Sequence, residues 1–282
     1  MSTFTIALLT FREASRRKVL LAALLLGLLF LIVFGLGFHF ITIQMEKDFQ
    51  NSRLIQLNEI RNFLLMAGMY VVNFLTAIMT VLTSVDTLSG EISTGTIHTL
   101  ISKPIRRWEV VFGKWLGFAG MITLYLLLMG GGVMIFIFLR SGYSAPHPVQ
   151  ALALIWLNDL VLLSVSLLGG ASFSTLTNGV LVFGLYGIAF IGGWIEQIGS
   201  FFRDQATGQT AINIGVITSL IMPSEALWKR AAHELQSPLV AVLGVSPFAS
   251  STYPSMIMIF YAVLYIAIAF ALAVRQFNRR DL

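Results

Sequence analysis

Residues that could do chemistry are few in this sequence, and their spacing assembles no catalytic centre. The four histidines lie in four different segments, so a metal site would need folding to bring them together: His39, His98, His147 and His233. Cysteine is missing, which excludes thiolate ligands, disulfides and a cysteine nucleophile. Asp159 is the only acidic residue well inside an apolar run. Such an acid is a functional candidate, although it can also reach the outer headgroups or pair internally.

A second chemical pattern is a polar stripe along residues 62–87. At about 100° per residue, these side chains share one helix face: Asn62, Met66, Met69, Asn73, Thr76, Thr80, Thr83 and Thr87. Amides and hydroxyls within a membrane need partners, so this face is expected to meet protein or a wet cavity. Two interpretations stay open, a seam between packed helices and a transport pathway lined by part of the stripe. The pathway residues would be Asn73, Thr76, Thr80, Thr83 and Asp159. The Asn and Thr groups of the stripe are neutral, which favours an amphipathic or neutral cargo.

The composition requires a membrane around these residues. Of the 282 residues, 57% are hydrophobic and only 11% are charged, against about 25% charged in an ordinary globular domain. A soluble fold could not cover its surface with so few charges, so we expect an all-α integral membrane protein. The net charge of +5 is small and dispersed, which argues against a nucleic-acid partner.

Sparse charges divide the chain into six apolar stretches, each near the 20 residues or so that a spanning helix needs. The predicted spans are residues 19–43, 63–85, 110–139, 151–175, 179–199 and 254–275, within a single membrane domain covering residues 1–282. An even number of spans puts both termini on one side. That side would carry 11 of the 18 Lys and Arg residues, which predicts that both termini are cytoplasmic.

Two segments outside the spans are also expected to be helical. Residues 2–18 indicate an interfacial helix before the first span. The long outer loop, 200–253, should contain a helix at about 224–235 that lies on the outer surface as a lid, or else a re-entrant pair of half-helices at 211–221 and 239–245. Residues 205–224 are not counted as a span because they are rich in Gly, Thr, Gln and Asn, and Glu196 is expected at the outer interface.

The cytoplasmic loop between the second and third spans, residues 86–109, has the most informative pattern. Gly90 and Gly95 interrupt the helix, Thr96 can cap a short new one, and Pro104 ends it. The next helix begins near Arg107. A short amphipathic helix here could present a rigid knob to a cytoplasmic partner, or the segment could be a turn at the lipid interface with its tryptophans as belt residues.

The residues of this region resemble the motif that permease subunits of type-2 ABC exporters carry at the same place. The matching positions are Gly90-Glu91, Gly95-Thr96, Leu100, Pro104-Ile105, Arg107 and Gly113-Lys114. The resemblance implies a coupling helix that docks on a separate ATP-binding subunit through Glu91, Gly95, Thr96, Leu100, Pro104, Arg107 and Lys114. Residues 222–230 are similar to the branch of the family grouped with multicopper-enzyme maturation.

The family further implies the composition of the transporter. It would contain two permease copies, identical or related, with spans two and five around the two-fold axis, and two ATP-binding subunits in the inner membrane. This chain has no G-x-x-x-x-G-K-[ST] motif, so it is not expected to be an enzyme or to bind a cofactor, and ATP and Mg²⁺ would bind the partner. Alternating access would export an unidentified substrate. The rival hypotheses are an ATP-independent secondary transporter or channel, and a non-transporting anchor for an assembly complex.

Overall fold

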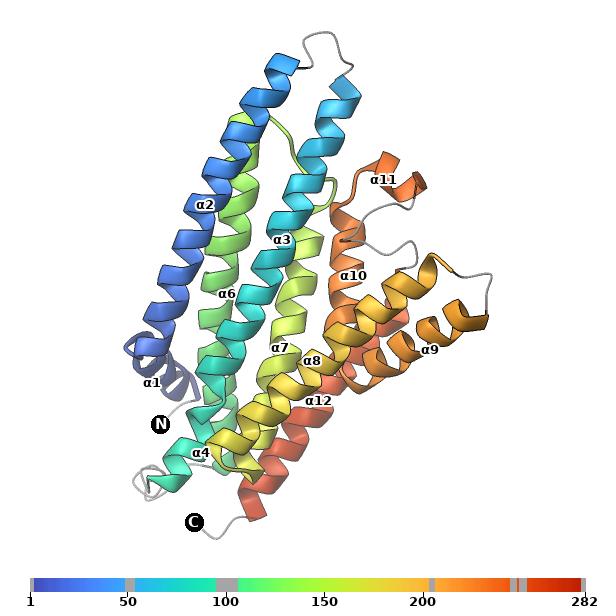
Figure 1. The fold of residues 1–282 in the computed structure, drawn as a ribbon. Helices are drawn as coiled ribbons and strands as arrows, with labels where there is room; N and C mark the ends of the chain where they lie inside the picture. Colours follow the sequence, from blue (N-terminus) through green and yellow to red (C-terminus); the bar gives the residue numbers. More distant parts are fainter. Residues whose placement is uncertain are drawn as a thin grey trace.

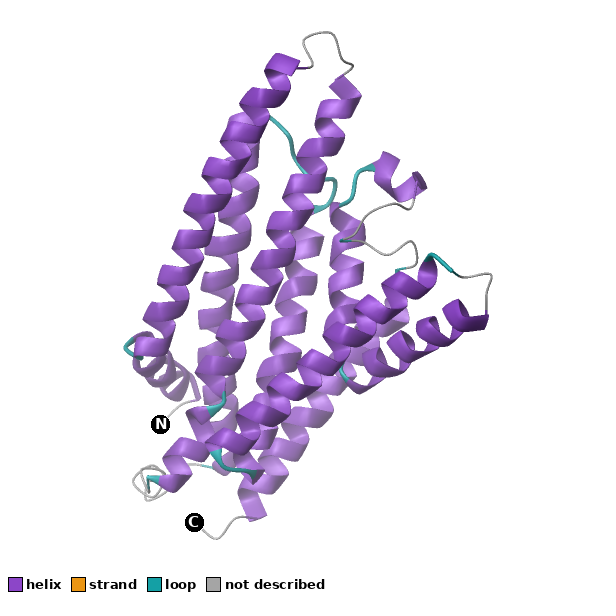
Figure 2. Ribbon diagram, viewed as in Figure 1, coloured by secondary structure: helices purple, strands orange, loops and turns teal. Residues whose placement is uncertain are grey.

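The computed structural model describes residues 3–48, 54–94, 106–202, 206–243, 248 and 253–279, and all of its regular elements over these residues are α-helices (Figures 1 and 2). In chain order they are α1 (Thr3–Ser15), α2 (Lys18–Asp48), α3 (Leu54–Ser84), α4 (Asp86–Ser93), α6 (Arg107–Ser141), α7 (Pro148–Ser172), α8 (Thr175–Ser200), α9 (Ala206–Ile221), α10 (Ser224–Leu235), α11 (Pro238–Leu243) and α12 (Met256–Arg279).

Six helices among the described residues are long and apolar enough to cross a membrane: Lys18–Met45, Leu57–Ser93, Arg107–Ser141, Pro148–Ser172, Thr175–Ser200 and Met256–Arg279. The prediction of an all-α membrane protein with six spans is therefore confirmed. Both termini lie at the end of the bundle that holds α1 and α4 (Figure 1). We call this the terminal end, and the end where α2 meets α3 the opposite end.

Burial separates a central helix from peripheral ones. Span α7 is the most buried of the six, whereas α2 and α12 are the least buried. The buried face of α7 includes polar residues, Asn158, Asp159, Ser164 and Ser166. A helix that is apolar on all sides, as α2 is, suits direct contact with lipid. The polar chemistry of the spans is thus gathered around α7.

The second span bends at Val85, where α3 ends and α4 begins. Several hydroxyls near the bend donate to carbonyls of the preceding turn: Thr83 to Met79, Ser84 to Thr80, and Ser89 to Val85. Such back-bonding competes with the helical ladder and often bends helices. The bend directs α4 toward the loop that begins after Thr94.

Helices α9 and α10 form a bent pair, with an angle of 106° between them across Met222 and Pro223. Their hairpin lies beside α8, and close glycine contacts permit the approach. A Cβ at Gly199 would lie 2.9 Å from the carbonyl oxygen of Gly208, and a Cβ at Gly215 would lie 2.9 Å from that of Gly192. These glycines recur seven residues apart on each helix, so two antiparallel turns of backbone meet.

The expected helix at residues 224–235 is present as α10, but its position differs from a lid lying on the surface. It packs against α7, α8 and α3, and Leu227, Trp228 and Leu235 are buried. The alternative of a re-entrant pair of half-helices agrees better with the structure. Its second helix is α10, however, and not residues 239–245. Apolar side chains on α10 provide the reason, since they are buried only against the spans.

Asn62 holds the far end of α10 in place. Its side-chain nitrogen donates to the Leu235 carbonyl at 2.8 Å and to the Tyr143 hydroxyl at 2.9 Å, and its oxygen accepts from the Ser237 amide at 3.1 Å. Burial raises the pKa of Tyr143 above its ordinary value, which keeps the phenol protonated. One amide thereby joins α3, α10 and the segment after α6.

The N-terminal helix α1 is present where an interfacial helix was expected, and it packs across the foot of α6. A Cβ at Gly113 would lie 2.7 Å from Cβ of Ile6, and one at Gly117 would lie 2.7 Å from the Ala7 carbonyl oxygen. The two glycines of α6 therefore form the seat for α1.

Candidate functional site

The described part of the family-like motif is organised around a buried ion pair at the terminal end. Lys114 on α6 donates a short hydrogen bond to Oε1 of Glu91 on α4. The Lys114 side chain is 3% exposed and that of Glu91 is 13% exposed. Oε2 of Glu91 has no hydrogen-bond partner among the described residues. The pair thus ties together the two helices that enter and leave the loop 95–105.

A second group of contacts fixes the start of α4. Asp86 accepts a hydrogen bond from the Thr175 hydroxyl at 3.0 Å, and its other oxygen lies 3.5 Å from Arg17. Ser89 and Thr175 hydroxyls lie 2.8 Å apart. Helix α4 is therefore connected to the α1–α2 junction and to the N-terminus of α8.

Asn178 completes this connection from within the bundle. Its side-chain nitrogen donates to the carbonyls of Val85 at 3.1 Å and Ser166 at 2.9 Å. A Cβ at Gly169 would lie 2.0 Å from Oδ1 of Asn178, so only glycine makes room for the amide. Sequence reasoning missed this residue, although an amide at the start of an apolar span is a usable signal.

Arg107, at the start of α6, contacts the end of the last span. Its guanidinium donates to the carbonyls of Phe277 at 3.3 Å and Asn278 at 3.1 Å. Favourable contact between a cation and terminal carbonyls is expected from the helix dipole. The remaining predicted coupling residues, Gly95, Thr96, Leu100 and Pro104, lie outside the described residues.

The polar stripe is buried within the chain. Thr76 and Thr83 are 1% exposed and Thr80 is fully buried. From Asn73 onward its contacts run to its own helix and to α7: Thr76 donates to the Asn73 carbonyl at 3.0 Å, and Asn158 donates to the Asn73 side chain at 3.3 Å. Ser84, one turn after Thr80, donates to Ser166 at 2.8 Å. In this arrangement the stripe lies between α3 and α7.

Asp159 is fully buried within the chain beside the stripe. The Thr76 side chain interacts with this carboxyl group. Oδ1 of Asn158 and Oγ1 of Thr80 have no hydrogen-bond partner among the described residues. A metal site is not assembled around Asp159, because the described residues contain no cluster of three or more His, Cys, Asp or Glu side chains. Its surroundings are polar and uncharged.

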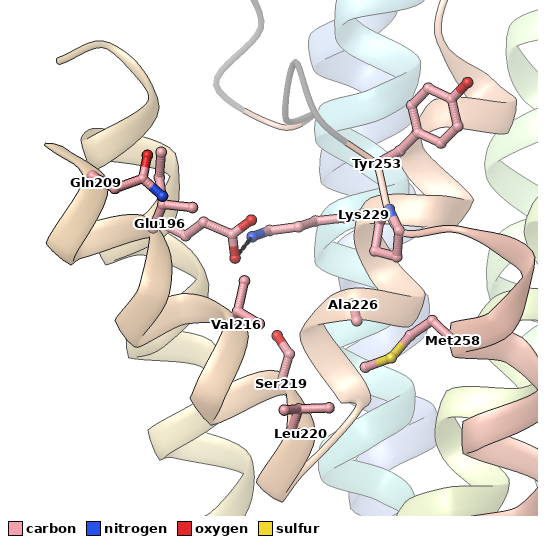
Figure 3. Close-up of a pocket in the computed structure, with 11 residues that line it drawn as sticks. Glu196, Gln209, Val216, Ser219, Leu220, Ala226, Lys229, Tyr253 and Met258 are labelled. Carbon is pink, nitrogen blue, oxygen red and sulfur yellow. Dashed lines mark ion pairs between the residues drawn. The ribbon is translucent and has the colours of Figure 1, made fainter. Parts of the chain in front are cut away.

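A cavity of about 520 Å³ lies between α8, α9, α10 and the start of α12. Figure 3 shows Lys229 reaching from α10 toward Glu196 on α8, with Val216, Leu220 and Met258 nearby. Nζ of Lys229 and Oε2 of Glu196 lie 2.7 Å apart, and the two side chains are 5% and 13% exposed. Glu196, expected at the outer interface, is paired with a buried lysine from α10. No spacing rule joins residues 196 and 229, so this ion pair could not be predicted from the sequence.

The wall of this cavity is held by the last span. Tyr261 and Tyr265 on α12 donate to the carbonyls of Leu220 and Ile221, the latter at 3.1 Å. These carbonyls belong to the end of α9, where the helix offers them no partner. The hydroxyls satisfy them in an apolar setting, where an unmatched carbonyl is costly.

Comparison with known proteins agrees with this architecture. The profile of a family described as ABC-2 family transporter protein matches residues 4–282. It covers the entire membrane bundle and does not single out the branch linked to multicopper-enzyme maturation. A search of curated proteins found no match. The chain therefore belongs to the ABC-2 transporter family, as the membrane permease subunit of an ABC transporter.

Proposed function

We propose that this permease works in an ATP-driven exporter, with ATP hydrolysed by a separate subunit that docks on the loop 95–105. The observation that carries the proposal is the Glu91–Lys114 pair, which closes the base of that loop. A force on the loop would reach α4 and α6 together, since a buried pair resists separation. The complex would contain two permeases in the inner membrane and two ATP-binding subunits on its cytoplasmic side. The multicopper-maturation branch stays a prediction.

The contacts of α4 supply the route from the loop to the spans. A shift of α4 would act on α3 through the bend at Val85, on α8 through Asp86 and Thr175, and on α1 through Arg17. Arg107 would carry the same movement to the end of α12. These are the discrete contacts that alternating access requires, because packed helices move as units.

We propose that exposed apolar residues of α3 and α8, and not the buried polar stripe, form the interface between two permease copies. Phe74 on α3 is 42% exposed and Trp194 on α8 is 38% exposed. The rings of Phe74 and Phe190 lie 6.2 Å apart, and the Trp194 indole donates to the Tyr70 hydroxyl at 3.0 Å. This shared aromatic face fits a two-fold axis at spans two and five, and it suits an amphipathic cargo.

The direct test is co-purification with the ATP-binding subunit, followed by ATPase and transport assays. Arg107→Ala and Glu91→Ala should lower transport per ATP hydrolysed while the chain stays in the membrane, whereas the exposed Arg12→Ala should not. A crosslinker on Ser102→Cys should capture the ATP-binding subunit. Loop crosslinks that never reach such a subunit would contradict the docking proposal.

Cysteine substitutions test the orientation and the two-fold axis, and the native chain adds no background. Asn278→Cys should react only from the cytoplasm and Ser144→Cys only from outside. Phe74→Cys should crosslink to its copy in the second subunit, and Thr80→Cys should not. A strong crosslink at residue 80 would instead support the stripe as the pathway.

Asp159 is the observation that favours the rival function, an ATP-independent transporter. A fully buried carboxylate inside a membrane span is typical of ion-coupled carriers. Transport that persists without any ATP-binding subunit, and that Asp159→Asn abolishes, would support the rival.

A further inference from the structure

We propose that the cavity between α8, α9, α10 and α12 binds an acidic single-chain amphiphile, with its headgroup at Lys229. This binding site goes beyond the proposed export function and does not depend on it. The cavity, at about 520 Å³, has the size of small-molecule sites in proteins. Its lining combines one buried ion pair with an apolar wall, which is the division that an amphiphile presents.

Lys229 provides the headgroup site. Its side chain is 5% exposed, and its ammonium group lies 2.7 Å from Glu196. The geometry of that contact is not that of a hydrogen bond, and Nζ has no hydrogen-bond partner among the described residues. An ammonium group carries three donors. A ligand with carboxylate or phosphate oxygens would satisfy donors that Glu196 leaves unmet.

The apolar wall provides the chain site. Val216 and Leu220 come from α9 and Met258 from α12, and they line the same cavity as Lys229 (Figure 3). Ser219 and Ala226 are small, which leaves room between α9 and α10 near the bend of the pair. An alkyl chain could therefore lie along α9 while its headgroup stays at Lys229.

The charges favour an acidic ligand over a basic or neutral one. The lysine is more buried than Glu196, and a second carboxyl group, that of Glu225, interacts with both of them. Burial raises the pKa of Glu225 to about 7, so that Glu225 does not carry a full negative charge at neutral pH and leaves the ammonium charge available to a ligand. A basic ligand would have to displace Lys229 from Glu196 and leave a buried ammonium unpaired, which is costly. The oxygen of a neutral ligand can accept from Lys229, but that hydrogen bond is weaker than one to a charged carboxylate or phosphate oxygen.

Photocrosslinking tests this site on the full-length chain in nanodiscs of zwitterionic phospholipid, without ATP or a partner subunit. The probe is dodecanoate with a mid-chain diazirine, compared with the matched alcohol. The carboxylate should label residues 212–220 and the region of Met258 at least about tenfold more than the alcohol, the ratio expected for loss of a charge-assisted hydrogen bond. Unlabelled dodecanoate and dodecyl phosphate should both compete, which separates a carboxylate-specific site from a general anion site.

Variants decide the role of each charge. Lys229→Met should reduce labelling about tenfold, Lys229→Arg should keep it, and Glu196→Gln should increase it severalfold. Lys18→Met, an exposed lysine at the terminal end, is the matched control and should change nothing. Equal labelling by carboxylate and alcohol, or undiminished labelling of monodisperse Lys229→Met, would overturn the proposal and indicate a cavity filled by bulk lipid. If Lys229→Met does not fold, Glu196→Gln decides, because unchanged labelling there has the same meaning. A failed transport assay would leave this binding result intact.

Discussion

Two lysine–glutamate pairs among the described residues are nearly removed from solvent. One joins α4 and α6 at the terminal end, and the other joins α8 and α10 at the cavity. Glu91–Lys114 and Glu196–Lys229 have almost the same exposure, 13% for each glutamate and 3% and 5% for the lysines. They differ in what is left over. In the first pair the unmatched atom is an acceptor, Oε2 of Glu91, and in the second it is a donor, Nζ of Lys229.

The difference shows that a buried ion pair is defined by its surroundings as much as by its two residues. Glu91–Lys114 joins two helices at the base of a loop, so its role is to keep these helices together. Glu196–Lys229 lines a cavity, so its charged groups can contact a bound ligand. The following predictions contrast the two pairs, from the largest expected effect to the smallest.

Lys114→Met should cause the largest loss. It leaves Glu91 buried without its cation, which costs about 3–5 kcal/mol when one partner of a buried pair is removed. The midpoint of thermal unfolding, followed by size-exclusion chromatography, should fall, and coupling to the ATP-binding subunit should be lost. Combining it with Glu91→Gln should recover part of the stability. No recovery in the double variant would mean that Lys114 acts through packing alone.

Lys229→Met should cost less, about 1–3 kcal/mol, because the cavity lets other donors reach the abandoned Glu196. Association with the ATP-binding subunit should be unchanged. The same midpoint measurement compares it directly with Lys114→Met. An equal fall in the unfolding midpoint of the two variants would contradict the distinction between a structural ion pair and a ligand-binding one.

Alanine substitutions at a glycine near each ion pair compare the two pairs by a steric change. A Cβ at Gly215 would lie 2.3 Å from Cβ of Glu196, and one at Gly113 would lie 2.7 Å from Cβ of Ile6. Each alanine variant should cost about 1–2 kcal/mol through overpacking. Gly215→Ala should also raise labelling by the acidic probe, because it pushes Glu196 away from Lys229. Gly113→Ala should leave labelling unchanged, which the photocrosslinking assay reads directly.

The exposed pair Glu13–Arg17 gives the smallest effect. Its atoms lie 2.8 Å apart, at side-chain exposures of 55% and 26%. Glu13→Gln should cost no more than about 0.5 kcal/mol, because solvent screens such pairs. A fall in the unfolding midpoint as large as that of Lys229→Met would show that burial does not control these energies.

The sequence predicts the spans well because charges are rare and the apolar runs are long. It also identifies the residues of the terminal-end pair, since Glu91 and Lys114 both belong to the motif of the resembled family. It does not reveal that they pair, because the contact depends on how α4 packs against α6. The periodicity of the sequence predicts which face of α3 is buried. It does not predict that α7 is the helix that packs against this face.

The sequence predicts the helices of the α9–α10 region better than their packing. A half-helix at 211–221 and a helix at 224–235 are both expected, and they correspond to α9 and α10. Their close contact with α8 through Gly208 and Gly215 does not follow from the composition, because glycine is common both in loops and at packed helix interfaces. The sequence also predicts that Lys229 lies among the charges of the outer loop. It is buried instead, because α10 packs against the spans.

The hydrogen bonds from Tyr261 and Tyr265 to the end of α9 also constrain how the protein is made. The carbonyls of Leu220 and Ile221 leave the ribosome about forty residues before the hydroxyls that satisfy them. Until α12 emerges, the bent pair has no complete set of partners in an apolar environment. The α9–α10 hairpin should therefore stay near the water interface during synthesis and enter its final depth last. Insertion of the last span would then be the step that completes folding.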